Sequence, residues 1–211
     1  MTNISTAAYE GKLFIVQQLV DKEPGILNTQ DQDGRTALHW AASGGHDNVV
    51  QFLLEKGASV SSRDESGWTP LMIAVELLLE HGSDPSLQNE TGQTVLHYAA
   101  SKNKPEICRV LLEHNANPNQ VNSTQQTPLH RAASLGHIGV VKILIAAKAR
   151  VNIRDQVANT PLHLACEEGH GDTALLLIQH GARADQPNRE GKTALDLCDA
   201  MFRAYLESQI D

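Results

Sequence analysis

Hydrophobic and polar positions recur along this chain at a nearly fixed spacing. In residues 36–57 a threonine precedes a short apolar stretch, then two glycines, then a second apolar stretch. The first stretch predicts a short inner helix with Thr36 as its N-cap and Gly44 near its end. The second predicts an outer helix at helical spacing, whose buried stripe is Val49, Val50, Leu53 and Leu54. A polar segment follows and predicts a hairpin finger that turns at Gly67.

The start of this repeat returns five times. The tetrapeptide that begins at Thr36 recurs at steps of 33, 25, 33, 33 and 33 residues, at Thr69, Thr94, Thr127, Thr160 and Thr193. Proline follows the threonine in three copies, where its missing N–H costs nothing. A period of about 33 with T-P-L-H is the signature of ankyrin repeats. The sequence therefore predicts an all-α solenoid of helix-turn-helix repeats with hairpin fingers.

The predicted solenoid is a single domain over residues 1–211, because stacked repeats share one core. We expect about seven repeats, including degenerate caps at both ends. Their bounds are N-cap 3–33, repeats 34–66, 67–91, 92–124, 125–157 and 158–190, and C-cap 191–211. In the C-cap, Asp196 stands where the regular repeats have histidine.

The third repeat, 67–91, is eight residues shorter than its neighbours. The missing part falls between Ala74 and Val75, where one helix should end and the next begin. Two explanations stay open, a true deletion or a stretch missing from the sequence at this point. We favour the second, because a real loss would leave an outer helix of about two turns and uncover the facing cores of both neighbours.

Composition narrows the classes of partner. The formal net charge of −8 argues against nucleic acid, which needs clustered lysine and arginine. No apolar run is long enough to span a bilayer, and the first residues lack a secretory signal pattern, so no membrane partner is expected. Cys108, Cys166 and Cys198 lie in different repeats, which indicates free thiols in a reducing compartment.

Ten histidines raise the question of metal or acid–base chemistry. Four of them, His39, His97, His130 and His163, are the fourth residue of the tetrapeptide, where we expect the imidazole to tie adjacent hairpins together. None has the spacing of a zinc site, and the chain has no phosphate loop, G-x-S-x-G or H-E-x-x-H motif. We therefore expect no enzyme activity, no catalytic residue, no metal and no cofactor.

The residues best suited to bind a protein lie on the fingers and inner helices. Exposed tryptophan and arginine are frequent interface anchors. The candidate partner-binding residues are Asp33, Arg35, Trp40, Asp64, Glu65, Trp68 and Lys102. The alternative is a set of solvated charged loops and packed tryptophans, and the residues alone do not choose between the two.

A short motif, L-x-C-x-E, occurs at Leu164, Cys166 and Glu168. Pocket proteins such as the retinoblastoma protein bind this motif in extended form. Here it falls in a predicted inner helix, so binding would require local opening. We expect Leu164 and Cys166 to be buried and helical, and Glu168 to be more exposed.

Several stretches resemble one ankyrin family more closely than the general repeat pattern. They are residues 31–41, 96–103, 130–133 and 159–168, and they are similar to the gankyrin family, the non-ATPase subunit 10 chaperones of the proteasome regulatory particle. The resemblance implies a monomeric, non-catalytic chaperone of the cytoplasm and nucleus. Such a chaperone clasps the C-terminal domain of a proteasomal ATPase on its concave face during assembly of the regulatory particle base.

The resemblance also implies roles for single residues. Arg35 and Lys102 would meet carboxylates of the ATPase from one concave groove, and Asp33 and Glu65 would meet basic side chains. Animal members of the family are also linked to the retinoblastoma protein and a cyclin-dependent kinase. Two alternatives remain: a generic ankyrin scaffold or kinase regulator, and an ankyrin module of a larger signalling enzyme.

Overall fold

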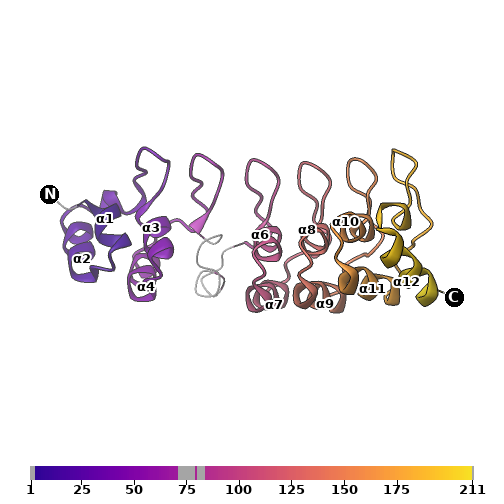
Figure 1. Ribbon diagram of the computed structural model, residues 1–211. Helices are drawn as coiled ribbons and strands as arrows, with labels where there is room; N and C mark the ends of the chain where they lie inside the picture. Colours follow the sequence, from indigo (N-terminus) through magenta and orange to yellow (C-terminus); the bar gives the residue numbers. More distant parts are fainter. Residues whose placement is uncertain (1–2, 71–78, 80–83, 211) are drawn as a thin grey trace. The chain divides into compact units, whose positions relative to one another are not determined.

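The computed structural model describes residues 3–70, 79 and 84–210, and for 207–210 the backbone alone. Its contacts divide the chain into two compact lobes, the N-lobe Met1–Glu90 and the C-lobe Thr91–Asp211. The described elements of both lobes are helices joined by turns and fingers (Figure 1). The all-α fold class is therefore confirmed, whereas the single domain stays a prediction. The junction between Ala74 and Val75 lies outside the described residues.

The N-lobe contains a degenerate first repeat and one regular repeat. Its described helices are α1 (Ile4–Tyr9), α2 (Leu13–Lys22), the 3-10 helix η1 (Pro24–Asn28), α3 (Ala37–Gly44) and α4 (Asp47–Glu55). Helix α1 packs on α3, and Ala7, Ala8 and Ala41 in these two helices are fully buried and small enough for a close approach. Helix α4 buries Val49, Val50 and Leu53 as expected, while Leu54 is half-buried.

The C-lobe stacks three regular repeats and a terminal helix. Its helices are α6 (Val95–Ser101), α7 (Pro105–Glu113), α8 (Pro128–Ser134), α9 (Ile138–Ala146), α10 (Pro161–Glu167), α11 (Gly171–Gln179), η3 (Leu195–Leu197) and α12 (Ala200–Ile210). The inner helices α6, α8 and α10 pack in one row, and the outer helices α7, α9 and α11 in a second row (Figure 1). The leucines at 33-residue steps that line both rows are fully buried: Leu96, Leu129 and Leu162, and Leu111, Leu144 and Leu177.

The tetrapeptide histidines cap their own helix. At α8, the Thr127 hydroxyl accepts a bond from the His130 N–H, and His130 Nδ1 accepts one from the Thr127 N–H at 3.1 Å. This capping box satisfies two backbone donors that a helix start would leave unpaired. The same arrangement begins α3, α6 and α10.

The other ring nitrogen of each histidine ties one finger to the next. Since Nδ1 accepts, Nε2 carries the proton and donates to a carbonyl 29 residues further on. These bonds join His39 to Trp68 at 3.1 Å, His97 to Gln126 at 2.9 Å, His130 to Asn159 at 3.2 Å and His163 to Lys192 at 3.3 Å. The predicted tie between hairpins is confirmed.

Two repeats depart from this arrangement. Asp196 replaces the histidine in the C-cap and accepts bonds from the Thr193 N–H and hydroxyl at 3.0 and 2.7 Å, so aspartate preserves the cap. At Thr69 the sequence has Met72 in the histidine position. The Thr69 hydroxyl is buried and has no hydrogen-bond partner among the described residues.

An aspartate or asparagine holds the base of five of the described fingers. Asp64 Oδ1 accepts bonds from the N–H groups two and four residues further on, at 3.0 and 2.9 Å. Asp31, Asn122, Asp155 and Asn188 make the same pair of bonds. Adjacent fingers are also joined at their tips, as where the Glu65 N–H donates to the Asp33 carbonyl at 3.0 Å.

Candidate functional site

In the N-lobe, an arginine lies over a tryptophan at the base of the fingers. The Arg35 Cζ atom is 5.0 Å from the centroid of the Trp40 ring, within range of a cation–π contact. Its Nε donates to Asp64 Oδ2 at 3.3 Å, and the Trp40 indole N–H donates to Asp31 Oδ2 at 2.6 Å. We call Asp31, Arg35, Trp40 and Asp64 the Arg35 cluster.

The two carboxylates of this cluster are held by hydrogen bonds. Burial alone would raise the pKa of Asp31, but bonds from the Trp40 indole and from the N–H groups of Arg35 and Asp33 hold that pKa below its usual value. The Asp64 side chain is only 3% exposed, and its bonds go to its own finger and to Arg35. Asp64 therefore positions Arg35 and offers a partner little surface of its own.

Arg35 is less exposed than the sequence indicated. Its side chain is 34% exposed and pairs with a buried carboxylate. A glutamate at this position would face the buried Asp64 carboxylate at close range, so we expect Arg35→Glu to destabilise the fold. Glutamine is the conservative replacement, because Gln126 makes the equivalent bond to Asp155 in the C-lobe, also at 3.3 Å.

The remaining candidates differ in exposure and in the lobe to which they belong. Asp33 and Glu65 are exposed on neighbouring finger tips, and Trp68 is half-buried. Lys102 is exposed at the end of α6 in the C-lobe, with its Nζ atom 5.9 Å from the Tyr98 ring centroid. Because Arg35 and Lys102 belong to different lobes, their common groove stays a prediction.

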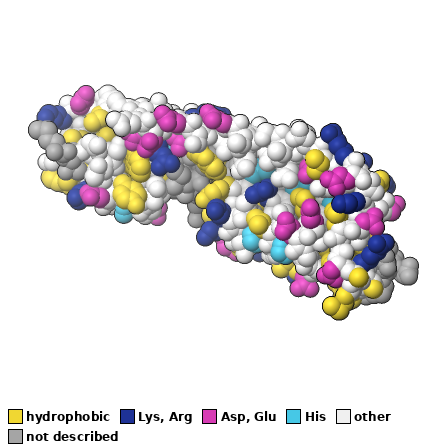
Figure 2. Space-filling model, turned by 45° about the horizontal axis from the view of Figure 1, so that its top comes forward, with side chains coloured by type: hydrophobic (Ala, Val, Ile, Leu, Met, Phe, Trp, Pro, Cys, Tyr) yellow, Lys and Arg dark blue, Asp and Glu magenta, His cyan; other side chains and the backbone are white. Residues whose placement is uncertain are grey.

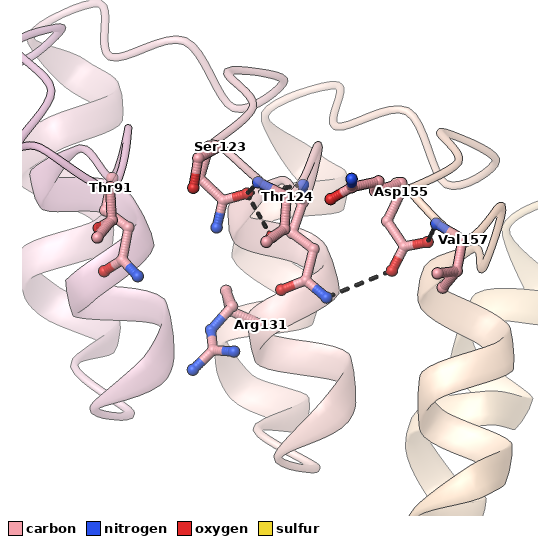
Figure 3. Close-up of a pocket in the computed structure, with 10 residues that line it drawn as sticks. Thr91, Ser123, Thr124, Arg131, Asp155 and Val157 are labelled. Carbon is pink, nitrogen blue, oxygen red and sulfur yellow. Dashed lines mark hydrogen bonds between the residues drawn. The ribbon is translucent and has the colours of Figure 1, made fainter.

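The C-lobe has a polar hollow beneath three successive fingers. It has a volume of about 470 Å³ and includes Thr91, Ser123, Thr124, Asp155 and Val157 in its lining (Figure 3). Arg131 enters it from α8, and its Nε donates to the Ser101 hydroxyl at 3.1 Å. Over the C-lobe, basic and acidic side chains are interspersed on the face in Figure 2. Most of the lining residues have polar side chains, so the hollow can offer hydrogen bonds to a polar segment.

Comparison with known families agrees with this architecture. A model described as "Ankyrin repeats (3 copies)" matches residues 4–77, 74–155 and 147–200, which cover most of the chain. The chain belongs to the ankyrin-repeat family. The solved ankyrin repeat domain of Bcl-3, a member of the IkappaB protein family, superposes with a TM-score of 0.88 and 25% identity, over 99% of this chain and 98% of that one.

Two curated relatives are similar over part of the ankyrin chain. The 26S proteasome non-ATPase regulatory subunit 10 of Mus musculus is 43% identical over 67 residues, which are 32% of this chain and 29% of that protein. An ankyrin repeat-containing protein of Schizosaccharomyces pombe is 40% identical over 107 residues, 45% of this chain and 46% of that protein. In these matches the chain spans less than half the length of either relative.

The ankyrin register identifies surface residues that the sequence analysis missed. In α3, α6, α8 and α10 the residue four positions after the capping threonine is half-buried or exposed, whereas the residues on either side of it are buried: Trp40, Tyr98, Arg131 and Leu164. Trp40 was selected for its residue type, but Arg131 was not selected at all. A comparison of the residues at the Trp40 position in all repeats would have identified Arg131.

The same register corrects one expectation for the L-x-C-x-E motif. Leu164 is helical but only half-buried, because it occupies this position in α10. Cys166 is 2% exposed and helical, and Glu168 is exposed at the C-cap, both as expected. Burial also raises the pKa of the Cys166 thiol, so the cysteine is a packed, protonated side chain.

We searched the described residues for groups of metal ligands and for helices that could span a membrane. Within 3–70, 79 and 84–210, no three His, Cys, Asp or Glu side chains are grouped so as to hold a metal ion. None of the helices described combines the length and apolar character needed to cross a membrane. The ankyrin fold itself is typically a non-catalytic scaffold for protein interactions.

Proposed function

We propose that this protein is a monomeric, non-catalytic chaperone that binds the C-terminal domain of a proteasomal ATPase during assembly of the regulatory particle base. Its place of action would be the cytoplasm and the nucleus. The observation that carries this proposal is the similarity to the proteasome non-ATPase subunit 10 over a third of the chain. The mechanism is stoichiometric: the chaperone occupies the ATPase, blocks premature docking and then leaves.

The chemistry of the exposed residues supports such a partner. The Arg35 guanidinium is bound to Asp64 through Nε, so its terminal nitrogens can take a partner carboxylate in a two-point bond. Lys102 supplies a second, exposed positive charge. Asp33 and Glu65, on adjoining finger tips, supply negative charge for basic side chains. The acidic net charge of −8 favours association with basic patches.

A general ankyrin scaffold, or a regulator of a kinase or the retinoblastoma pathway, is the alternative. The superposition on the Bcl-3 repeats along nearly the whole chain fits that class equally well. Direct use of the L-x-C-x-E motif is less favoured, since Cys166 would have to leave the packed α10. Pull-down from lysate separates the classes by recovering proteasomal ATPases, a kinase or neither.

The residue-level test is a titration against the ATPase C-terminal domain. We compare the wild type with Arg35→Gln, Lys102→Gln and the double variant, since glutamine preserves the bond to Asp64 as Gln126 does to Asp155. Arg35→Gln should weaken binding more than Lys102→Gln because only arginine forms a two-point bond with a carboxylate. The double variant should lose about 2–5 kcal/mol of binding free energy, mostly as faster dissociation. A folded double variant with wild-type affinity would refute the assigned residues.

A further inference from the structure

A second hollow lies in the N-lobe, on the side of Trp40 that faces α1. Its volume is about 320 Å³, and its lining includes Asn3, Tyr9, Glu10, Asp31 and Trp40. Arg35 does not line it, although Arg35 contacts the same tryptophan. The hollow is therefore distinct from the finger tips at Asp33 and Glu65 and from the exposed nitrogens of Arg35.

Two aromatic rings form a corner of this hollow. The Tyr9 and Trp40 rings meet edge to face, with centroids 5.9 Å apart and planes at 89°. Tyr9 is 51% exposed, so its ring is open to a ligand. Aromatic faces attract ammonium and guanidinium groups, and Arg35 over Trp40 is an example within the protein itself.

Among the residues that the structure describes, one carboxylate of the hollow has no ionic partner at hydrogen-bond distance. Glu10 pairs with Lys12 at 2.7 Å, and Arg35 pairs with Asp64 at 3.3 Å. Asp31, in contrast, accepts hydrogen bonds from uncharged groups, the Trp40 indole and two backbone N–H groups. These bonds keep Asp31 ionised and fix its direction toward the rings. The Arg35 charge also acts on Asp31, but Arg35 forms its salt bridge with Asp64, so the hollow combines two aromatic walls with a carboxylate that has no salt bridge among the described residues.

We propose that this hollow binds a cationic side chain, lysine or arginine, of a partner protein. The Tyr9 and Trp40 rings surround the aliphatic stem and the cation, and the Asp31 carboxylate is the counter-charge. An amphipathic stem with a charged end matches this combination of apolar walls and carboxylate. The inference does not depend on the proteasomal partner, because it concerns the chemistry of one side chain and not the identity of the protein that carries it.

The Trp40 indole N–H provides a direct readout. Trp40 and Trp68 are the two tryptophans of the chain, so a ¹⁵N NMR spectrum shows two indole signals, and Trp68→Phe assigns them. We titrate the protein with acetylated arginine amide and acetylated lysine amide, and with acetylated norleucine amide as the uncharged analogue. The two cationic probes should shift the Trp40 indole signal in a concentration-dependent way, and norleucine amide should leave it nearly unchanged.

Matched variants test the counter-charge. Asp31→Asn should preserve the finger, because Asn122 and Asn188 hold their fingers with the same pair of bonds. It also replaces the Oδ2 atom that accepts the Trp40 indole N–H with an NH2 group, so the variant removes both the charge and that bond. We expect it to bind both cationic probes about fivefold more weakly, in the upper range for an exposed ion pair. Asp155→Asn makes the same exchange in a C-lobe finger and should bind like the wild type. Tyr9→Leu, which spares the finger, should also weaken binding severalfold.

Two results would overturn the proposal. A shift of equal size with norleucine amide would make the hollow an apolar site without preference for a cation. Equal affinity of the wild type and Asp31→Asn for the cationic probes would show that Asp31 does not act as the counter-charge. If Asp31→Asn failed to fold, an unchanged affinity in Tyr9→Leu would still contradict the assigned walls.

Discussion

The Arg35–Asp64 contact in the N-lobe and the Gln126–Asp155 contact in the C-lobe are the same bond made with different chemistry. In both, the residue before the capping threonine donates to a carboxylate 29 positions further on, at 3.3 Å. A third junction joins Asn188 to Asn159 at 2.8 Å without any formal charge. The geometry of the finger junction therefore does not require an ion pair.

This difference separates the contacts that hold the repeats together, which we call the frame, from the side chains that would bind a partner. The frame consists of neutral histidine ties and of Asp or Asn finger bases, which recur in both lobes. Charge at position 35 is added to a junction that an amide can make equally well. We interpret the guanidinium of Arg35 as a binding group that the frame positions, and the predictions below test that separation.

Acidification should weaken the frame most. Burial lowers the pKa of His97 and His130 to about 4, below the ordinary value of 6.5 for an unfolded chain. Between these values the unfolded state binds more protons than the folded state, so stability is full above pH 6.5 and falls as the pH decreases toward 4. We expect a loss on the order of 4 kcal/mol across this window for the two groups together. Urea unfolding at pH 7.5, 6 and 5 measures it, and a flat profile would contradict the neutral ties.

Removal of one histidine tie should lower the free energy of unfolding nearly as much as acidification does. His130→Ala deletes the imidazole half of the cap at Thr127 and the bond to the Asn159 carbonyl, and leaves buried polar groups without partners. We expect a loss of about 3 kcal/mol of unfolding free energy. His180→Ala is the control, because that histidine bonds within its own helix to the Leu176 carbonyl and should cost less than about 1 kcal/mol. Similar losses in the two variants would mean that the tie is not specific. The pH dependence should also become shallower in His130→Ala.

Charge reversal at the N-lobe junction should have an intermediate effect. Arg35→Glu places a second carboxylate against Asp64, whose side chain is 3% exposed, and should cost about 2 kcal/mol. Arg35→Gln copies the C-lobe junction and should change stability by less than about 0.5 kcal/mol. Thermal or urea unfolding of both variants gives the comparison. If Arg35→Gln were as destabilising as Arg35→Glu, the ion pair would belong to the frame after all.

The sequence predicted the parts of this structure that depend on nearby residues. The helix from Thr36 to the Gly45 turn follows from a cap, an apolar stripe and a stop within ten positions, and α3 has these bounds. The burial of Asp64 was not predictable in the same way. It depends on a contact between its finger and Arg35, which lies 29 positions earlier in the chain. The Tyr9–Trp40 corner likewise joins two repeats, and no local pattern marks it. Contacts between repeats therefore determine which side chains remain available to a partner.

Adding or removing a single methyl group at a finger turn should have the smallest effect on the free energy of unfolding. The sign of the effect should differ between the two exchanges that we propose in the two lobes. Gly34 and Gly67 adopt positive φ angles of 73° and 75° in the N-lobe, but in the C-lobe Ala158 adopts the same conformation, with φ of 66°. A side chain there is strained, and at Gly34 a Cβ atom would lie 2.9 Å from the backbone nitrogen of the next finger. Ala158→Gly should therefore stabilise the protein by about 0.5 kcal/mol, since relief of strain exceeds the entropy that glycine gains when unfolded.

The reverse exchange, Gly34→Ala, introduces both the strained conformation and the close contact, and should destabilise by about 1–2 kcal/mol. Urea unfolding of the two single variants resolves the opposite signs, provided that both have the same dependence on urea concentration as the wild type. Destabilisation by Ala158→Gly would mean that the Ala158 methyl group makes contacts in the C-lobe finger that outweigh its strain. The finger frames of the two lobes would then differ in packing, and Gln126 could no longer serve as the template for Arg35→Gln.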